Sequence, residues 1–206
     1  AVIGGIMVPH PPLIVPEVGR GQEILIKDTI KAYQEAAGMA AELKPDTIVV
    51  ISPHAVMYAD YFHVSPGKKA RGDFGRFMAP QIGVEAGYDE AFVRELDRLC
   101  GDDGFPMGTE GEREKELDHG TLVPLYFINQ HYRDYKLVRI GGSGLSFADH
   151  YRAGRYIARA AENLGRSVFI VASGDLSHKL RGDGPYGYRV QGPEYDERIM
   201  DVMGKA

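Results

Sequence analysis

The sequence has little of several features that mark whole classes of protein. Cys100 is the one cysteine among 206 residues, so an internal disulfide framework is excluded and a reducing compartment is favoured. There is no tryptophan, and no apolar run approaches the roughly 18 residues that a membrane-spanning helix needs. The apolar first eight residues follow no basic segment, so they do not resemble a signal peptide. We therefore expect a cytoplasmic protein with no membrane partner.

A basic patch is also missing. The formal net charge is −5, from 24 basic and 29 acidic residues, and the lysines and arginines are scattered among the acids. Proteins that bind nucleic acid usually gather their basic residues on one face, so we expect no nucleic-acid partner. Glycine, in contrast, is abundant, with 26 residues that fall mostly at the ends of apolar runs. This placement is typical of strands that turn into loops.

Apolar runs of strand length alternate along the chain with segments of helical apolar spacing. The expected strands are residues 1–8, 47–52, 61–64, 137–140 and 167–172, and the first of them is interpreted as buried. The expected helices are residues 21–43, 89–100, 120–131, 148–164 and 193–204. This alternation predicts an α/β fold with a mainly parallel sheet that helices cover on both faces.

Two further segments lack such patterns. Residues 66–87 contain five glycines and two prolines, and we expect a long loop or flap with one edge strand at most. This segment either lines a pocket or is an ordinary surface loop. Residues 101–116 are acidic and polar and are expected to form a loop, whereas Cys100 lies on the apolar side of its helix and is expected in the core.

Histidines stand directly after three of the expected strands. His10 lies in MVPHPP, His54 in ISPHAV and His178 in SGDLSH, while His119 in LDHGT begins a helix. In an open parallel sheet, ligands bind beyond the carboxyl ends of the strands. Side chains from distant parts of the sequence are therefore expected to converge there.

These histidines suit a metal ion. Neighbouring prolines hold His10 and His54 on stiff backbone, and two imidazoles with a carboxylate suit Fe(II) or Zn(II). Asp118 and Asp175 are candidate hydrogen-bond partners for ring N–H groups. Residue types alone leave the reaction open, because such sites also serve zinc hydrolysis. The histidines without such a setting are expected to be structural or solvated, namely His63, His131 and His150.

The motifs VPHPP, SPH, LDHG and SGDLSH together resemble the LigB-like superfamily of class III extradiol ring-cleavage dioxygenases. The resemblance runs along the whole chain and is strongest in GIMVPHPPLIVPEVG and VASGDLSHKL. Within the superfamily the chain is most similar to the MEMO-like branch, including AmmeMemoRadiSam-system proteins in which this domain precedes an AMMECR-type domain. The resemblance implies a three-layer αβα sandwich, a catechol-like aromatic substrate, and a fused or neighbouring AMMECR-type domain.

The resemblance also implies roles for individual residues. His10 and His54 match the two histidine ligands of a non-haem Fe(II), which is expected in preference to Zn(II). His178 matches the acid–base histidine of active dioxygenases, and His119 matches a further active-site histidine near the substrate. The third ligand of those enzymes is a glutamate well beyond the SGDLSH segment. We therefore expect residues 1–206 to be a single LigB-like domain truncated before that ligand, with an incomplete or empty site.

A second function remains open at this point. Some MEMO-like relatives keep the fold but replace metal ligands, so a non-catalytic metal-binding or scaffold protein is the alternative to a dioxygenase. A homo-oligomer is compatible with either function.

Overall fold

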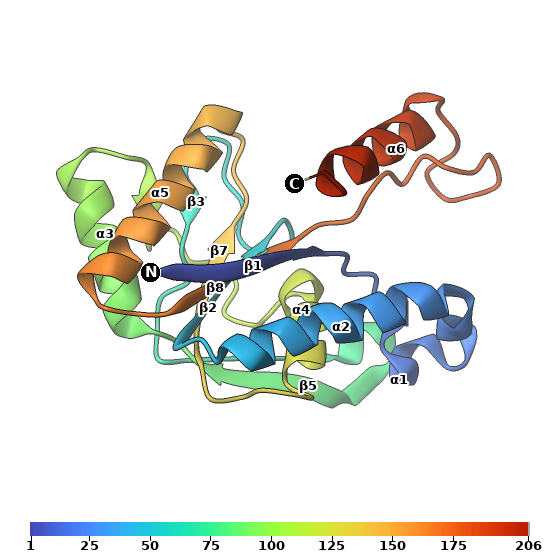
Figure 1. Cartoon of the computed structure of the whole chain (residues 1–206), viewed down its shortest axis with the longest axis horizontal. Helices are drawn as coiled ribbons and strands as arrows, with labels where there is room; N and C mark the ends of the chain where they lie inside the picture. Colours follow the sequence, from blue (N-terminus) through green and yellow to red (C-terminus); the bar gives the residue numbers. More distant parts are fainter. Residues whose placement is uncertain (206) are drawn as a thin grey trace. The chain divides into compact units, whose positions relative to one another are not determined.

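The computed structural model describes residues 1–205, and the chain divides into two compact units, Ala1–Ser173 and Gly174–Ala206. The first unit is built on a four-stranded sheet in the order β1-β8-β2-β7 (Figure 1). Its strands are β1 (Val2–Val8), β2 (Thr47–Ser52), β7 (Lys136–Gly141) and β8 (Val168–Ser173). Every ladder in this sheet is parallel, which confirms the expected α/β class.

Helices cover both faces of this sheet (Figure 1). The bounds of the four long helices are α2 (Lys27–Leu43), α3 (Glu90–Asp102), α4 (His119–Ile128) and α5 (Phe147–Asn163). Side chains of β2 alternate between two apolar clusters, because successive residues of a strand point to opposite faces. Ile48 and Val50 pack with α2 and α4, whereas Val49 packs with α3 and α5. The result is the expected three-layer arrangement.

Residues 66–87 are not the loop that their glycines and prolines predict. They form an antiparallel hairpin of β4 (Lys69–Phe74) and β5 (Ala79–Gly87), joined by the short 3-10 helix η3 (Gly75–Phe77). Phe74, Ala79 and Val84 are buried in the cluster that contains α2 and α4. Tertiary packing thus stabilises strands that local composition does not favour.

The first strand is also placed differently from the expectation. β1 pairs with β8 alone and lies at an edge of the sheet, so it is not fully buried. Val2 and Ile3 are each 38% exposed and Met7 is 47% exposed. An apolar run cannot reveal whether a strand is central or at an edge, because that depends on strand order.

The remaining elements of the first unit are short. They are η1 (Pro12–Ile14), α1 (Pro16–Gly19), η2 (Gln22–Ile26), β3 (Phe62–His63) and β6 (Met107–Gly108). The expected helix 21–43 is therefore divided between η2 and α2. The expected loop 101–116 contains β6, which pairs in parallel with β3. Cys100 is fully buried, as expected, and burial raises the pKa of its thiol to about 12.

The second unit contains the helix α6 (Gln191–Met203), two residues longer at its start than predicted. An antiparallel bridge joins Leu180 to Tyr188, and the backbone N–H of Ser177 donates to Asp196 Oδ1 at 2.7 Å. Among the helices of residues 1–205, none combines the length and apolar character that crossing a membrane requires.

Candidate metal centre

Three histidine side chains meet at one end of the sheet in the first unit. His10, His54 and His119 each offer a ring nitrogen, and these nitrogens all lie within 4.8 Å of one another. The Nε2 atoms of His10 and His54 are 3.1 Å apart, and the ring centroids of His54 and His119 are 4.0 Å apart. His10 is buried, His119 is half-buried and His54 is exposed. The structure thus brings together three of the four histidines that the sequence singled out.

Strand order explains this convergence. His10 follows β1 and His54 follows β2, and β8 lies between these two parallel strands. Because all of these strands end at the same edge, two histidines 44 positions apart in the sequence become neighbours. His119 reaches the same place as the first residue of α4.

Ser173, the last residue of β8, orients the His10 ring. Its hydroxyl donates to the carbonyl oxygen of Gly120 at 2.5 Å and lies 2.9 Å from His10 Nδ1. A serine hydroxyl carries a single hydrogen, so the His10 Nδ1–H must be the donor in the second contact. The Nε2 atom of His10 then presents a lone pair toward the cluster. Fixing the ring through its other nitrogen is the usual support for a metal-ligating histidine.

Asp118 supports the backbone that carries the other two histidines, His54 and His119. Its carboxylate caps α4 by accepting from the Thr121 backbone N–H at 3.0 Å, which fixes the turn that carries His119. It also accepts from the Ser52 hydroxyl at 2.5 Å, and Ser52 Oγ in turn accepts from the His54 backbone N–H at 3.1 Å. These contacts were not predicted from the sequence. The predicted bond from Asp118 to a histidine ring stays a prediction.

A buried arginine balances the charge of Asp118. Arg139, in the middle of β7, has no solvent exposure, and its Nε and Nη2 atoms lie 3.1 and 3.0 Å from Asp118 Oδ2. Burial alone would raise the pKa of Asp118, but Arg139 and the hydrogen bonds from Ser52 and Thr121 outweigh it and hold that pKa below its usual value. Sequence analysis missed Arg139, although a charged residue inside the apolar run KLVRIG was the available signal.

Gly120 is required by close packing beneath the cluster. A Cβ atom at this position would collide with Ser52 Oγ and would lie 3.4 Å from His54 Cδ2. Only glycine lets the first turn of α4 approach the end of β2 this closely. The His-Gly pair in LDHGT therefore has a structural reason in addition to the chemistry of its histidine.

A cavity of about 150 Å³ adjoins the cluster, and His54 and His119 form part of its wall. Phe77 lies edge-on to His119 with ring centroids 5.4 Å apart, and Leu122 adds a further apolar surface. Phe77 belongs to the hairpin segment 66–87, so this segment does line a pocket. The cavity offers a small, partly apolar space directly beside the histidine nitrogens.

The histidines fit a transition-metal ion. Metal–nitrogen bonds of about 2.1 Å place two ligand nitrogens roughly 3.0 Å apart for an octahedral angle near 90° and roughly 3.4 Å apart for a tetrahedral angle near 109°. The His10–His54 separation of 3.1 Å between Nε2 atoms lies within this range. Imidazole nitrogen also suits Fe(II) and Zn(II) alike, so the donor set does not choose between these ions.

The remaining predicted residues lie in the second unit. His178 Nε2 is 3.9 Å from Asp175 Oδ2, which is an ion-pair distance and longer than a hydrogen bond. The His178 ring also lies 4.8 Å from that of Tyr186. The roles predicted for His178 and Asp175 stay predictions.

The other three histidines have structural surroundings. His131 Nε2 lies 2.9 Å from Gln34 Oε1, and His150 Nδ1 lies 2.9 Å from the Ser146 carbonyl oxygen. His63 is fully buried, and neither of its ring nitrogens has a hydrogen-bond partner among the described residues.

The chain is similar to several known proteins. The chain is 38% identical to a Clostridium acetobutylicum protein whose name states no activity, over 97% of this chain and 44% of that protein. It is 26% identical to the 3,4-dihydroxyphenylacetate 2,3-dioxygenase of Escherichia coli, over 75% of this chain and 57% of the enzyme. It is 24% identical to the 2-aminophenol 1,6-dioxygenase beta subunit of a Pseudomonas species, over 98% of this chain and 74% of the subunit.

The chain thus spans about half the length of the first two of these relatives. The model of one family, described as the catalytic LigB subunit of aromatic ring-opening dioxygenase, matches residues 4–206. That match covers nearly the whole chain, including all three histidines of the cluster. The chain therefore belongs to the LigB family.

Proposed function

We propose that this chain forms the Fe(II) site of an extradiol dioxygenase that opens a catechol-like aromatic ring with O₂. The observation that supports it most directly is the meeting of three histidine nitrogens within 4.8 Å at the carboxyl end of the sheet. Family membership and the two dioxygenases among the relatives support the reaction class. In this reaction one ring C–C bond next to a hydroxyl carbon breaks, and both atoms of O₂ enter the product.

Each residue has a role in this proposal. His10 and His54 hold the metal, and Ser173 keeps the His10 ring in the tautomer that a ligand needs. The bound ion supplies a Lewis acid that lowers the pKa of a substrate hydroxyl and keeps the reactants adjacent. His119 hydrogen-bonds the substrate, and Phe77 and Leu122 contact its ring in the adjoining cavity. His178 transfers protons to and from the substrate, because an imidazole ring can both accept and donate a proton.

Further features belong to the same proposal. We place the chain in the MEMO-like branch, in the cytoplasm, with an AMMECR-type domain fused or encoded nearby. A carboxylate completes the coordination of the metal, as in the His₂–carboxylate sites of other non-haem iron enzymes.

The test begins with anaerobic Fe(II) titration of the protein with its native flanking sequence, followed by O₂ uptake with a panel of catechols. We expect one Fe(II) per chain and O₂ uptake coupled to the absorbance of a ring-opened product. The His54→Ala variant removes one ligand and is expected to lose both. Tight iron binding without turnover would contradict the dioxygenase proposal and favour a metal-binding role. Activity with Zn(II) and none with Fe(II) would favour a hydrolase.

A further inference from the structure

The cavity beside the histidines has an unequal set of charges around it. Five ionisable side chains other than histidine line it, and among these described residues four are acidic and one is basic. The residues are Asp73, Arg76, Glu114, Glu116 and Asp118. Because charges near a small cavity act on any charged group that enters it, their balance decides which substituents a substrate can carry.

Two of the four carboxylates are neutralised within the protein. Asp118 is paired with the buried Arg139, whose Nη2 lies 3.0 Å from Asp118 Oδ2. Glu114 is paired with Arg76, and the two charged groups lie 3.2 Å apart. The one basic side chain of the cavity is therefore already matched, and neither pair leaves a net charge.

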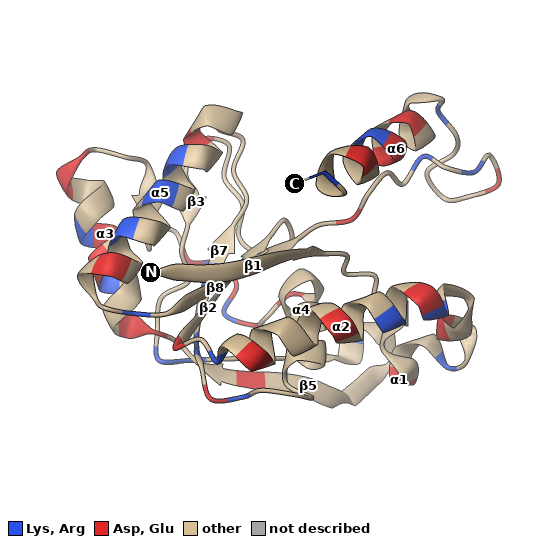
Figure 2. Ribbon diagram, in the orientation of Figure 1, with Lys and Arg blue, Asp and Glu red and all other residues tan. Residues whose placement is uncertain are grey.

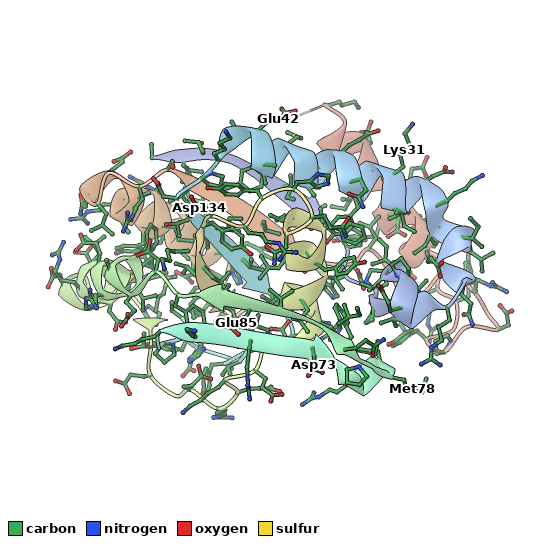
Figure 3. All side chains as sticks on the ribbon, turned by 90° about the horizontal axis from the view of Figure 1, so that it is seen from below. Lys31, Glu42, Asp73, Met78, Glu85 and Asp134 are labelled. Carbon is green, nitrogen blue, oxygen red and sulfur yellow. The ribbon has the colours of Figure 1, made fainter. Side chains whose placement is uncertain are left out.

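Asp73 and Glu116 have no such partner. No ion pair of either carboxylate occurs among residues 1–205, although Asp73 Oδ1 accepts from the Gly75 backbone N–H at 2.7 Å. Both residues are exposed, and both line the cavity. Figure 3 shows Asp73 on the β4–β5 hairpin, toward the same end as Met78. These two residues give the cavity an excess charge of two negative units.

From this balance we propose that the cavity selects aromatic substrates that are neutral or carry a protonated amine, and disfavours those that carry a carboxylate. The proposal rests on the proposed function, because it concerns the substituent of a substrate bound at the same site. The hydroxyls of every catechol bind the metal ion, so Asp73 and Glu116 act on the charge of the ring substituent. At a separation near 8 Å and an effective dielectric constant near 40, one charge changes affinity by about fivefold.

The test measures anaerobic binding of three probes to the Fe(II)-loaded protein by calorimetry. The probes are dopamine, catechol and 3,4-dihydroxybenzoate, which are cationic, neutral and anionic. Their intrinsic affinities for iron differ, so the informative quantity is the change between the native protein and the Asp73→Asn/Glu116→Gln double variant. We expect this variant to gain about tenfold or more for 3,4-dihydroxybenzoate, to lose a similar factor for dopamine, and to leave catechol within about twofold.

A matched control removes one charge elsewhere. Glu42→Gln, on α2 and on the opposite side of the view in Figure 3 from Asp73, is expected to leave all three affinities unchanged. Raising the salt concentration from about 0.05 to 0.5 M should reduce the preference of the native protein but not that of the double variant.

Other outcomes overturn the proposal in distinguishable ways. If the double variant leaves the dopamine and 3,4-dihydroxybenzoate affinities unchanged, the acidic residues do not select the substrate. If Arg76→Gln weakens 3,4-dihydroxybenzoate alone, Arg76 leaves Glu114 to bind a substrate carboxylate and the opposite selectivity holds. If catechol itself does not bind to protein that holds Fe(II), the proposed function fails and this inference fails with it.

Discussion

The first unit contains two buried polar regions that differ in how far their side chains are hydrogen-bonded. The region behind the histidine cluster contains Asp118 and Arg139, and the carboxylate of Asp118 accepts hydrogen bonds from several surrounding groups. The region around His63 is equally buried, but neither ring nitrogen there has a hydrogen-bond partner among the described residues. The carboxylate of Glu112 lies close to this ring, with Oε2 4.0 Å from His63 Nε2.

The difference shows what each region contributes. Arg139 Nη2 contacts Asp118 as an ion pair and makes no hydrogen bond among the described residues. The other groups of this buried network are hydrogen-bonded, and their bonds fix the two turns that carry His54 and His119. A buried polar group without partners costs free energy and fixes little. We therefore expect substitutions near Asp118 to affect both folding and metal binding, and substitutions at His63 to affect folding alone.

Breaking the hydrogen-bonded region around Asp118 should have the largest effect on stability. Arg139→Met keeps the volume but leaves the Asp118 charge buried without its partner, and we expect a loss of about 3–5 kcal/mol in the free energy of unfolding. Urea denaturation measures it. Adding Asp118→Asn to this variant removes the uncompensated charge and should recover part of the loss. A loss below about 1 kcal/mol in Arg139→Met would contradict the assigned pairing.

The close packing of Gly120 against Ser52 should give the next largest effect on stability. Alanine normally stabilises a helix by about 0.5–1 kcal/mol over glycine, and Gly154→Ala in α5, where a Cβ meets nothing within 4 Å, should show this gain. Gly120→Ala should instead cost roughly 1–3 kcal/mol, because the new Cβ collides with Ser52 Oγ. Thermal unfolding measures the shift in Tm of both variants, which should be upward for Gly154→Ala and downward for Gly120→Ala. Equal shifts in Tm would mean that the first turn of α4 does not pack closely against the end of β2.

Ser173→Ala should separate metal binding from folding. The change removes the acceptor for His10 Nδ1–H, and we expect the affinity for Co(II), used as a spectroscopic probe, to fall about 10- to 100-fold. The free energy of unfolding should fall by only about 1 kcal/mol. Unchanged Co(II) affinity would show that Ser173 does not set the tautomer of His10.

The smallest effect should come from the unsatisfied region. Burial lowers the pKa of His63 from 6.5, while Glu112 opposes this shift and Arg139 adds to it. The unfolded chain therefore binds a proton more readily, so the native protein loses stability as the pH falls below about 6.5. His63→Leu should flatten this dependence between pH 7 and pH 5 and change stability little at pH 7.5. Weaker Co(II) binding in this variant would contradict the separation of the two regions.

Much of the fold follows from local pattern. The runs TIVVIS and SVFIVA become β2 and β8, because continuous β-branched and apolar sequence suits a strand covered on both faces. The α3 and α5 helices are capped at their N-termini by Asp89 and Ser146, whose side chains accept from backbone N–H groups three residues later. Such signals act over a few residues, so one sequence is enough to read them.

Other features depend on contacts between distant segments. The hairpin at 66–87 exists because Phe74 and Val84 pack on the core, and no local signal overrides its glycines and prolines. The edge position of β1 and the burial of His63 likewise depend on which strands and loops become neighbours.

The candidate site combines both kinds of information. The sequence by itself singled out the candidate metal ligands, because His10 and His54 each stand just beyond an apolar strand. Only the tertiary structure decided that β8 lies between their strands, which brings Ser173 to His10, and that β7 lies beside β2, where Arg139 meets Asp118. The physical reason is that side-chain chemistry belongs to each residue, whereas strand order results from packing the whole core at once.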